Sequence, residues 1–192
     1  MSLPPAVALR SLQPEDTGVV RRLWDARFGG AASTQMHWLE AALAPGPSVA
    51  AFVATRRSDD EVLGFSLLDV GDRAYTRHYL GLDVLDLEVP LADRNGVFHL
   101  SCVRPAWEGR GLGTAFYKRR LAELDRRHVP RAVGVAWHRP DRGDSRVLFD
   151  AHDFSRLATV DRFYSRTGRR PHCPACDGAC TCTASLHVRS LR

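Results

Sequence analysis

Three glycines at alternate positions, Gly109, Gly111 and Gly113, stand between an apolar run and a helical pattern. The apolar run covers 97–103 and predicts a strand, which Pro105 ends. Glycine has no Cβ, so this turn can approach a ligand closely and point consecutive N–H groups into one concavity. The first N–H groups of the following helix lack intrahelical partners and carry the positive end of the helix dipole. The stretch therefore predicts a cradle for a pyrophosphate group.

A second group of chemically active residues lies near the C-terminus, in the Cys-rich loop 172–182. Four of the five cysteines fall within it, namely Cys173, Cys176, Cys180 and Cys182. In a reducing compartment such crowding favours a metal, because thiolates bind zinc tetrahedrally. We therefore predict a structural zinc ion (Zn) on these four residues, since four protein ligands leave no open position for a substrate. His172 is an alternative ligand, and disulfides, an iron–sulfur site or no ligand are alternative interpretations.

The glycine spacing narrows the class of phosphate ligand. A dinucleotide-binding fold has G-x-G-x-x-G near the start of a domain, whereas the spacing here is G-x-G-x-G and two-fifths of the chain precedes it. A nucleoside-triphosphate loop has Gly-Lys-Ser/Thr, and the sequence contains no such triplet.

The stretch V-R-P-A-W-E-G-R-G-L-G-T-A, residues 103–115, resembles the coenzyme A signature of the GNAT superfamily of N-acetyltransferases. It departs from the family pattern at Glu108, where Gln or Arg is usual. The resemblance implies that acetyl-CoA is the co-substrate and that main-chain N–H groups hold its pyrophosphate. The implied coenzyme-binding residues are Cys102, Val103, Glu108, Gly109, Arg110, Gly111, Leu112, Gly113 and Thr114.

Acetyl transfer to an amine sets the remaining catalytic requirements. The amine must lose a proton before it attacks the thioester, and the resulting oxyanion needs an N–H donor. The resemblance implies that the N–H groups near Cys102 and Val103 supply it, and that the base lies on the same strand. Val97 cannot act as a base. His99, two residues on along the same face, is the candidate, and a hydrogen-bonded core histidine is the alternative interpretation.

A second family landmark, F-Y-x-x-x-G-F, is similar to residues 145–154. This alignment places Phe149 where many family members have the tyrosine that protonates the departing thiolate. Phenylalanine has no proton to give. The candidates that remain are Tyr164, Ser145 and water. Tyr164 is expected on a strand over 157–164, where a half-buried structural tyrosine is the alternative.

The predicted order of elements resembles the GNAT core. We expect an α/β (α+β) fold with a central mixed, mostly antiparallel sheet of roughly six to seven strands flanked by helices, and the Cys-rich loop before the last strand. The expected strands cover 7–12, 48–55, 61–70, 97–103, 131–137, 157–164 and 183–189, and the expected helices cover 19–28, 34–43, a segment after the glycines and 145–154.

Residues 71–96 form an insertion that is too long for a tight hairpin. One interpretation is a lid whose carboxylates attract a cationic acceptor. The other is an elaborated strand pair, because L-D-V-L-D-L-E-V at 82–89 alternates as an edge strand does.

Composition favours a single domain over 1–192, since 192 residues at 44% hydrophobic bury one good core. No apolar run approaches the roughly 20 residues that span a bilayer, and no signal sequence opens the chain, so we expect a cytoplasmic protein without a membrane segment. The net charge is +5, yet Lys118 is the single lysine among 27 basic residues. Charge alone therefore does not predict nucleic-acid binding.

Together, these features predict an enzyme that moves an acetyl group from acetyl-CoA to a primary amine by direct attack in a ternary complex. The acceptor is a small amine or a protein N-terminus. Two alternatives stay open: a catalytically degenerate coenzyme A-binding module, and an interaction protein acting through a zinc knuckle. A homodimer is compatible with the sequence.

Overall fold

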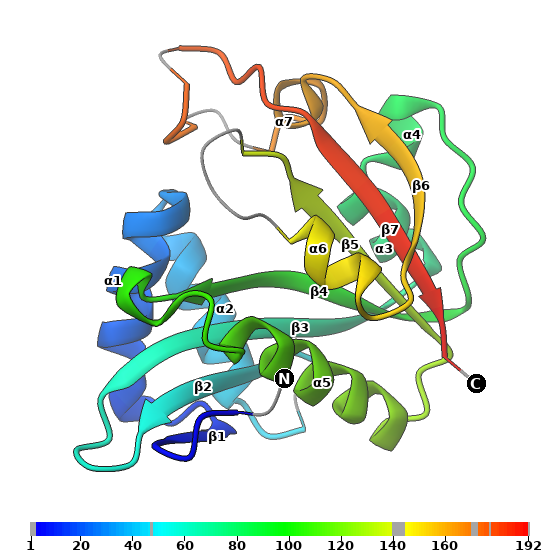
Figure 1. Cartoon of the computed structure of the whole chain (residues 1–192). Helices are drawn as coiled ribbons and strands as arrows, with labels where there is room; N and C mark the ends of the chain where they lie inside the picture. Colours follow the sequence, from blue (N-terminus) through cyan, green and yellow to red (C-terminus); the bar gives the residue numbers. More distant parts are fainter. Residues whose placement is uncertain (1–2, 47, 140–144, 170–172, 177, 192) are drawn as a thin grey trace. The chain divides into compact units, whose positions relative to one another are not determined.

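The computed structural model describes residues 3–46, 48–139, 145–169, 173–176 and 178–191. Its strands are β1 (Val7–Ser11), β2 (Ala50–Arg56), β3 (Val62–Asp72), β4 (Arg94–Val103), β5 (Arg131–Trp137), β6 (Ser155–Val160) and β7 (Ala184–Ser190) (Figure 1). They form a seven-stranded sheet in the order β1-β2-β3-β4-β5-β7-β6. The β4–β5 pair is parallel, and the β1–β2, β2–β3, β5–β7 and β6–β7 pairs are antiparallel. The predicted mixed, mostly antiparallel sheet is confirmed.

The helices are η1 (Pro14–Asp16), α1 (Thr17–Phe28), α2 (Ala32–Leu43), α3 (Arg73–Leu80), α4 (Leu82–Leu85), η2 (Pro105–Trp107), α5 (Leu112–Arg126), α6 (Arg146–Asp150) and α7 (Phe163–Arg166). Among the described residues, no helix combines the length and the apolar character needed to cross a membrane. Internal contacts divide the chain into two compact units. The first unit comprises Met1–Asp69 and His99–Arg120, and the second comprises Val70–Phe98 and Leu121–Arg192.

The first unit has a layered core because β3 is buried along most of its length. Neighbouring side chains of a strand point to opposite faces, so alternate residues meet different helices. Phe65 stacks on Trp24 of α1 with ring centroids 6.0 Å apart. At the preceding position, Gly64 faces α5, where an added Cβ would lie 3.4 Å from the Phe116 ring. The helices α1 and α2 thus cover one face of these strands and the start of α5 covers the other (Figure 1).

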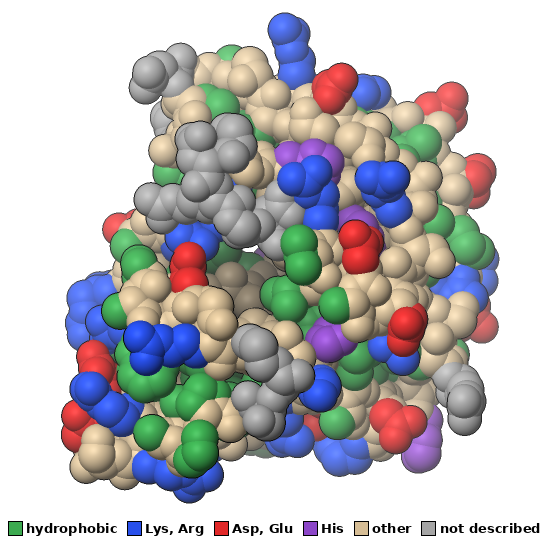
Figure 2. Space-filling model, in the orientation of Figure 1, with side chains coloured by type: hydrophobic (Ala, Val, Ile, Leu, Met, Phe, Trp, Pro, Cys, Tyr) green, Lys and Arg blue, Asp and Glu red, His purple; other side chains and the backbone are tan. Residues whose placement is uncertain are grey.

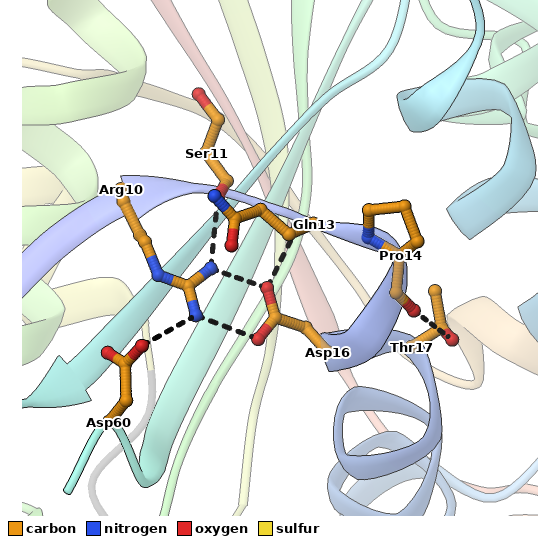
Figure 3. A network of polar contacts seen from close by, with 7 residues as sticks. All are labelled: Arg10, Ser11, Gln13, Pro14, Asp16, Thr17 and Asp60. Carbon is orange, nitrogen blue, oxygen red and sulfur yellow. Dashed lines mark hydrogen bonds and ion pairs between the residues drawn. The ribbon is translucent and has the colours of Figure 1, made fainter.

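A buried ion pair fixes the passage from β1 into the first helices (Figure 3). The Arg10 guanidinium binds both carboxylate oxygens of Asp16, at 2.6 and 3.0 Å, and Asp16 is 4% exposed. Asp16 also accepts the Gln13 N–H at 2.8 Å. Asp60 approaches Arg10 only at 3.8 Å and is 74% exposed. Because charge-assisted bidentate contacts are the stronger ones, Asp16 is the partner that holds this corner.

The second unit centres on β7, which lies between β5 and β6 (Figure 1). Phe149 of α6 is 2% exposed and packs on this sheet. Its ring stacks on His187 with centroids 4.5 Å apart and meets Phe154 edge-on at 4.9 Å. Gly134 of β5 makes the room, because a Cβ there would come within 2.4 Å of the Phe149 ring. Phe149 is therefore an apolar core residue of the second unit.

The insertion at 71–96 contains the two helices α3 and α4, so the interpretation of 82–89 as an edge strand is wrong. Asp72 caps α3 by accepting the Tyr75 N–H at 2.7 Å, and Gly81 ends that helix at φ 68°. The apolar residues Leu82 and Leu85 of α4 are both buried, at the helical spacing of three. A short alternating run fits both periods, and in this segment the chain starts a new helix directly after Gly81.

Acidic residues of the insertion pair with arginines of the same segment. Arg77 contacts Asp83 at 2.7 Å and Glu88 at 3.4 Å, and Arg73 contacts Asp93 at 3.2 Å. The lid interpretation stays a prediction, but these carboxylates already have cationic partners.

Candidate functional site

The glycine turn between β4 and α5 belongs to the first unit. The helix η2 follows β4 and is closed by the Trp107 N–H, which donates to the Arg104 carbonyl at 2.8 Å. Gly109 and Gly111 then adopt φ 72° and φ 85°. Both values lie in the left-handed region that glycine enters without a Cβ penalty. Two of the three predicted glycines are therefore required by the backbone itself.

At the N-terminus of α5, the first main-chain N–H groups have no acceptor within the helix. The Ala115 N–H donates to the Gly111 carbonyl at 3.0 Å, which is the first bond of the helix. The N–H groups of residues 112–114 precede that bond and lack intrahelical acceptors. Gly113 and Thr114 are half-buried, and their small side chains leave this end accessible. The structure thus gathers the predicted residues 109–114 at one helix N-terminus, which suits a phosphate group.

Two residues that the sequence analysis did not single out hold the turn in place. The Arg104 side chain donates through Nε to the Val62 carbonyl at 2.7 Å, and its main-chain N–H donates to the Leu63 carbonyl at 2.8 Å. At Gly64, an added Cβ would come within 2.6 Å of the Cys102 carbonyl oxygen. A lone glycine inside an apolar strand signals such a close approach, so Gly64 was detectable from sequence.

The carboxylate of Glu108 has a partner outside the turn. Its Oε1 lies 2.9 Å from the Arg27 guanidinium of α1. The negative charge that would oppose a phosphate is therefore compensated, and Glu108 faces the turn through its main chain. The Arg110 guanidinium lies 5.1 Å from the Trp107 ring centroid, and Arg110 is exposed. On the face shown in Figure 2, basic and acidic side chains are interspersed rather than gathered into one basic stripe.

At the end of β4, main-chain groups are the part of the strand that a ligand could contact. Cys102 is 5% exposed, and its Sγ lies 3.6 Å from the Leu23 carbonyl of α1. The thiol thus belongs to the apolar core, so Cys102 could contact a ligand only through its backbone groups. The neighbouring Ser101 hydroxyl is buried and has no hydrogen-bond partner among the described residues. A buried unsatisfied hydroxyl beside a free strand end fits a polar ligand that runs along the strand.

His99 lies at the point where the pairing of β4 changes. In the described register, β5 pairs with Gly96–Phe98 of β4, and β4 continues to Val103. His99 is half-buried, and its ring lies 4.0 Å from Trp38 of α2 at an interplanar angle of 63°. This edge-on contact can hold the imidazole in one orientation. Trp38 was not predicted, because contacts between a helix and a distant strand leave no local pattern.

Tyr164 belongs to the second unit, and its predicted placement on a strand is wrong. The strand β6 ends at Val160, and Tyr164 lies in the short helix α7. It is 7% exposed and meets Trp137 edge-on, with ring centroids 6.2 Å apart. Arg162, at φ 53°, turns the chain out of the strand direction before Tyr164 is reached. The residue is therefore more deeply buried than the half-buried strand position implied.

The four cysteines of the C-terminal loop converge in the second unit. The sulfur atoms of Cys173, Cys176, Cys180 and Cys182 all lie within 4.8 Å of one another. Burial raises the pKa of Cys182 to about 12 and also raises the pKa of Cys173. A hydrogen bond from the backbone N–H of Thr181 lowers the pKa of Cys176 to about 7. The four cysteines that the sequence grouped thus lie together, and His172 lies outside the described residues.

A scan against protein-family models gives no match, and neither does a search of the curated proteins. Solved structures do match. NAA60 from Arabidopsis thaliana, in complex with acetyl-CoA, is 12% identical with a TM-score of 0.72 over 96% of this chain and 98% of that one. The ribosomal-protein-S18-alanine N-acetyltransferase of Escherichia coli is 15% identical, with a TM-score of 0.62 over 96% and 93%.

A third similar structure is a candidate acetyltransferase of the GNAT family from Desulfovibrio desulfuricans. It is 15% identical, with a TM-score of 0.65 over 96% of this chain and 99% of that one. At such low identity these likenesses establish the architecture, and together with the strand order they settle the fold. The chain has the fold of the GNAT acetyltransferases.

Proposed function

We propose that this protein transfers an acetyl group from acetyl-CoA to a primary amine. The observation that carries the proposal is the pair of left-handed glycines, Gly109 and Gly111, at the open N-terminus of α5. They let consecutive N–H groups converge on a doubly charged phosphate chain. The acetyl-CoA complex of the Arabidopsis structure with this fold supports the choice of ligand.

Residues 109–114 would hold the pyrophosphate of the coenzyme, and Arg110 would add a cation from its exposed position. The backbone of Cys102 and Val103 would bind the pantetheine arm, and the buried Ser101 hydroxyl offers it a further polar partner. When bound, acetyl-CoA supplies the activated acetyl thioester. The residues around it position the thioester and exclude water.

His99 is the proposed general base. The neutral imidazole would accept a proton from the attacking ammonium group, directly or through one water. The amine nitrogen then bonds to the acetyl carbon, and a β4 N–H near Cys102 or Val103 stabilises the oxyanion. The carbon–sulfur bond breaks, the electron pair leaves with the coenzyme sulfur, and the nitrogen loses its second proton to solvent to give the amide. Trp38 would keep the imidazole in orientation through the 4.0 Å ring contact.

The thiolate must then gain a proton, and Phe149 cannot supply one. Tyr164 is the proposed donor, because its phenol carries a proton that phenylalanine lacks, with Ser145 and water as the alternatives. The variant Tyr164→Phe removes only the hydroxyl group of this proposed donor and therefore tests its role.

The first experiment measures acetyl-CoA binding by calorimetry and then acetylated product by mass spectrometry. The amine panel contains a polyamine, an arylalkylamine and peptides with different N-termini. Product formation on any of them supports acetyl transfer. Binding without turnover across the panel would favour the degenerate coenzyme-binding module, and the absence of binding would refute the proposal.

The role of His99 is tested by His99→Ala, which we expect to lower kcat by at least tenfold across the pH range and to leave the Kd for acetyl-CoA within about twofold. The matched control is His37→Ala, because His37 contacts the same Trp38 ring at 6.2 Å but is exposed on α2. A smaller loss for His99→Ala, or an equal loss for His37→Ala, would show that His99 is not the base.

A further inference from the structure

We infer that the cysteine cluster is a closed zinc site that clamps the C-terminal loop onto the beginning of β7. This inference does not depend on the proposed acetyl transfer, because the ligands share no residue with the coenzyme cradle. It rests on the geometry of four sulfurs and on the hydrogen bonds that anchor one of them.

Two of the distances between the sulfurs match tetrahedral coordination. Four sulfurs at about 2.3 Å from a zinc ion are about 3.8 Å apart from one another. The Sγ atom of Cys182 lies 3.7 Å from that of Cys173 and 3.5 Å from that of Cys176. The separation is too long for a sulfur–sulfur bond, and all five cysteines are free thiols in the structure.

The local backbone is built around these sulfurs. The Cys176 N–H donates to the Cys173 carbonyl at 3.3 Å and closes a turn. The N–H groups of Ala175 and Thr181 donate to the sulfurs of Cys173 and Cys176. Gly178 follows at φ 107°, a conformation that strains a residue with a side chain. These turns keep the cysteines of the loop close together.

Cys182 connects the cluster to regular structure. Its carbonyl accepts the Phe163 N–H at the start of α7, at 3.1 Å. The adjacent Thr183 accepts the His138 N–H at 3.0 Å through its carbonyl, and its hydroxyl donates to Asp161 at 2.8 Å. Residues 182–183 are thus tied to the segments that follow β5 and β6. A metal that joins Cys182 to the other cysteines would fix the whole loop to that junction.

The burial of the ligands favours a metal over four free thiols. Cys173 and Cys180 are 7% and 2% exposed, whereas Cys176 and Cys182 are half-buried. Among the described loop residues, 173–176 and 178–183, no helix or strand is formed. The loop therefore lacks the backbone ladder that would otherwise hold four sulfurs together. With all four positions of the ion filled by protein, the site has a structural role.

The test uses the full chain purified in reducing buffer with zinc present and metal content measured by mass spectrometry. We expect about one zinc ion per chain, and an intense thiolate-to-metal absorption when cobalt(II) replaces it. Chelation should lower Tm by at least about 5 °C. Cys176→Ser and Cys182→Ser should each bind less than half as much zinc. Cys176 is the safer variant for folding, because it is only half-buried.

The matched control is Cys102→Ala, which removes the one cysteine outside the cluster and should leave the zinc content unchanged. Iron in place of zinc, disulfide-linked cysteines in the mass spectrum under reducing preparation, or a protein free of metal would each overturn the inference. Acetyl-CoA binding is measured on the same samples. The proposed acetyl transfer and the proposed zinc site are thereby tested separately, because either one can fail while the other holds.

Discussion

The glycine cradle and the cysteine cluster present ligand-binding groups in opposite ways. The cradle offers main-chain N–H groups, and its side chains matter mainly by being small or by pointing elsewhere, as Cys102 and Glu108 do. The cluster offers side-chain sulfurs, and its backbone matters by turning four residues inward. A main-chain site should therefore tolerate changes of side-chain chemistry but not of φ. A side-chain site should lose its bound ion when a single ligating sulfur atom is removed.

The supports of the two sites differ as well. The cradle stands on a buried strand and two helices, with Arg104 bonded to carbonyls of β3. The cysteine loop has few apolar residues and is anchored through Cys182 and Thr183. Packing can hold the glycine cradle in position without a ligand, whereas the cysteine loop depends on its proposed zinc ion.

The largest effect is expected for Gly111→Val. A β-branched residue at φ 85° strains the turn and displaces the N–H groups, so the Kd for acetyl-CoA should rise at least tenfold, or about 1.4 kcal/mol. Gly30→Val is the matched control, because Gly30 has φ 105°, nothing lies within 4 Å of an added Cβ, and it is outside the cradle. Calorimetric titration checks both. Equal affinity losses would mean that backbone strain acts through general destabilisation.

A separate effect, on stability rather than on coenzyme binding, is expected for Asp16→Asn, which keeps the shape of the side chain but removes the charge that binds Arg10 (Figure 3). The free energy of unfolding should fall by about 1.5 to 3 kcal/mol in urea titrations. Zinc content should not change, because Asp16 and the cysteines belong to different units. Asp60→Asn should cost less than about 0.5 kcal/mol, since that carboxylate is 74% exposed. A comparable loss from Asp60→Asn would contradict the assigned partner.

The smallest effect is expected for Cys102→Ala. Because the thiol faces the Leu23 carbonyl, acetyl-CoA affinity should change by less than about twofold. Calorimetry on the purified variant measures it, with the wild-type chain titrated in parallel. A change of tenfold or more would show that the thiol contacts the coenzyme, and the division into main-chain and side-chain sites would fail.

Local patterns predicted much of the fold. The strands, α1, α2 and α5 lie where apolar periodicity and helix-breaking residues indicated, because those signals arise from neighbours in sequence. Residues 82–89 were misassigned, since eight alternating residues fit a strand and a helix equally. Tyr164 was misplaced because Arg162 turns the chain at φ 53°, which no neighbouring pattern announced.

The sequence by itself determined the glycine spacing of the cradle, the grouping of four cysteines and the order of elements, because each depends on residues close together along the chain. Only the tertiary structure decided that Arg27 compensates Glu108, that Trp38 lies against His99 and that Cys182 is anchored beside α7. These contacts join segments that are distant in sequence. Their partners are selected by packing of the whole unit, and that selection leaves no trace in any local pattern.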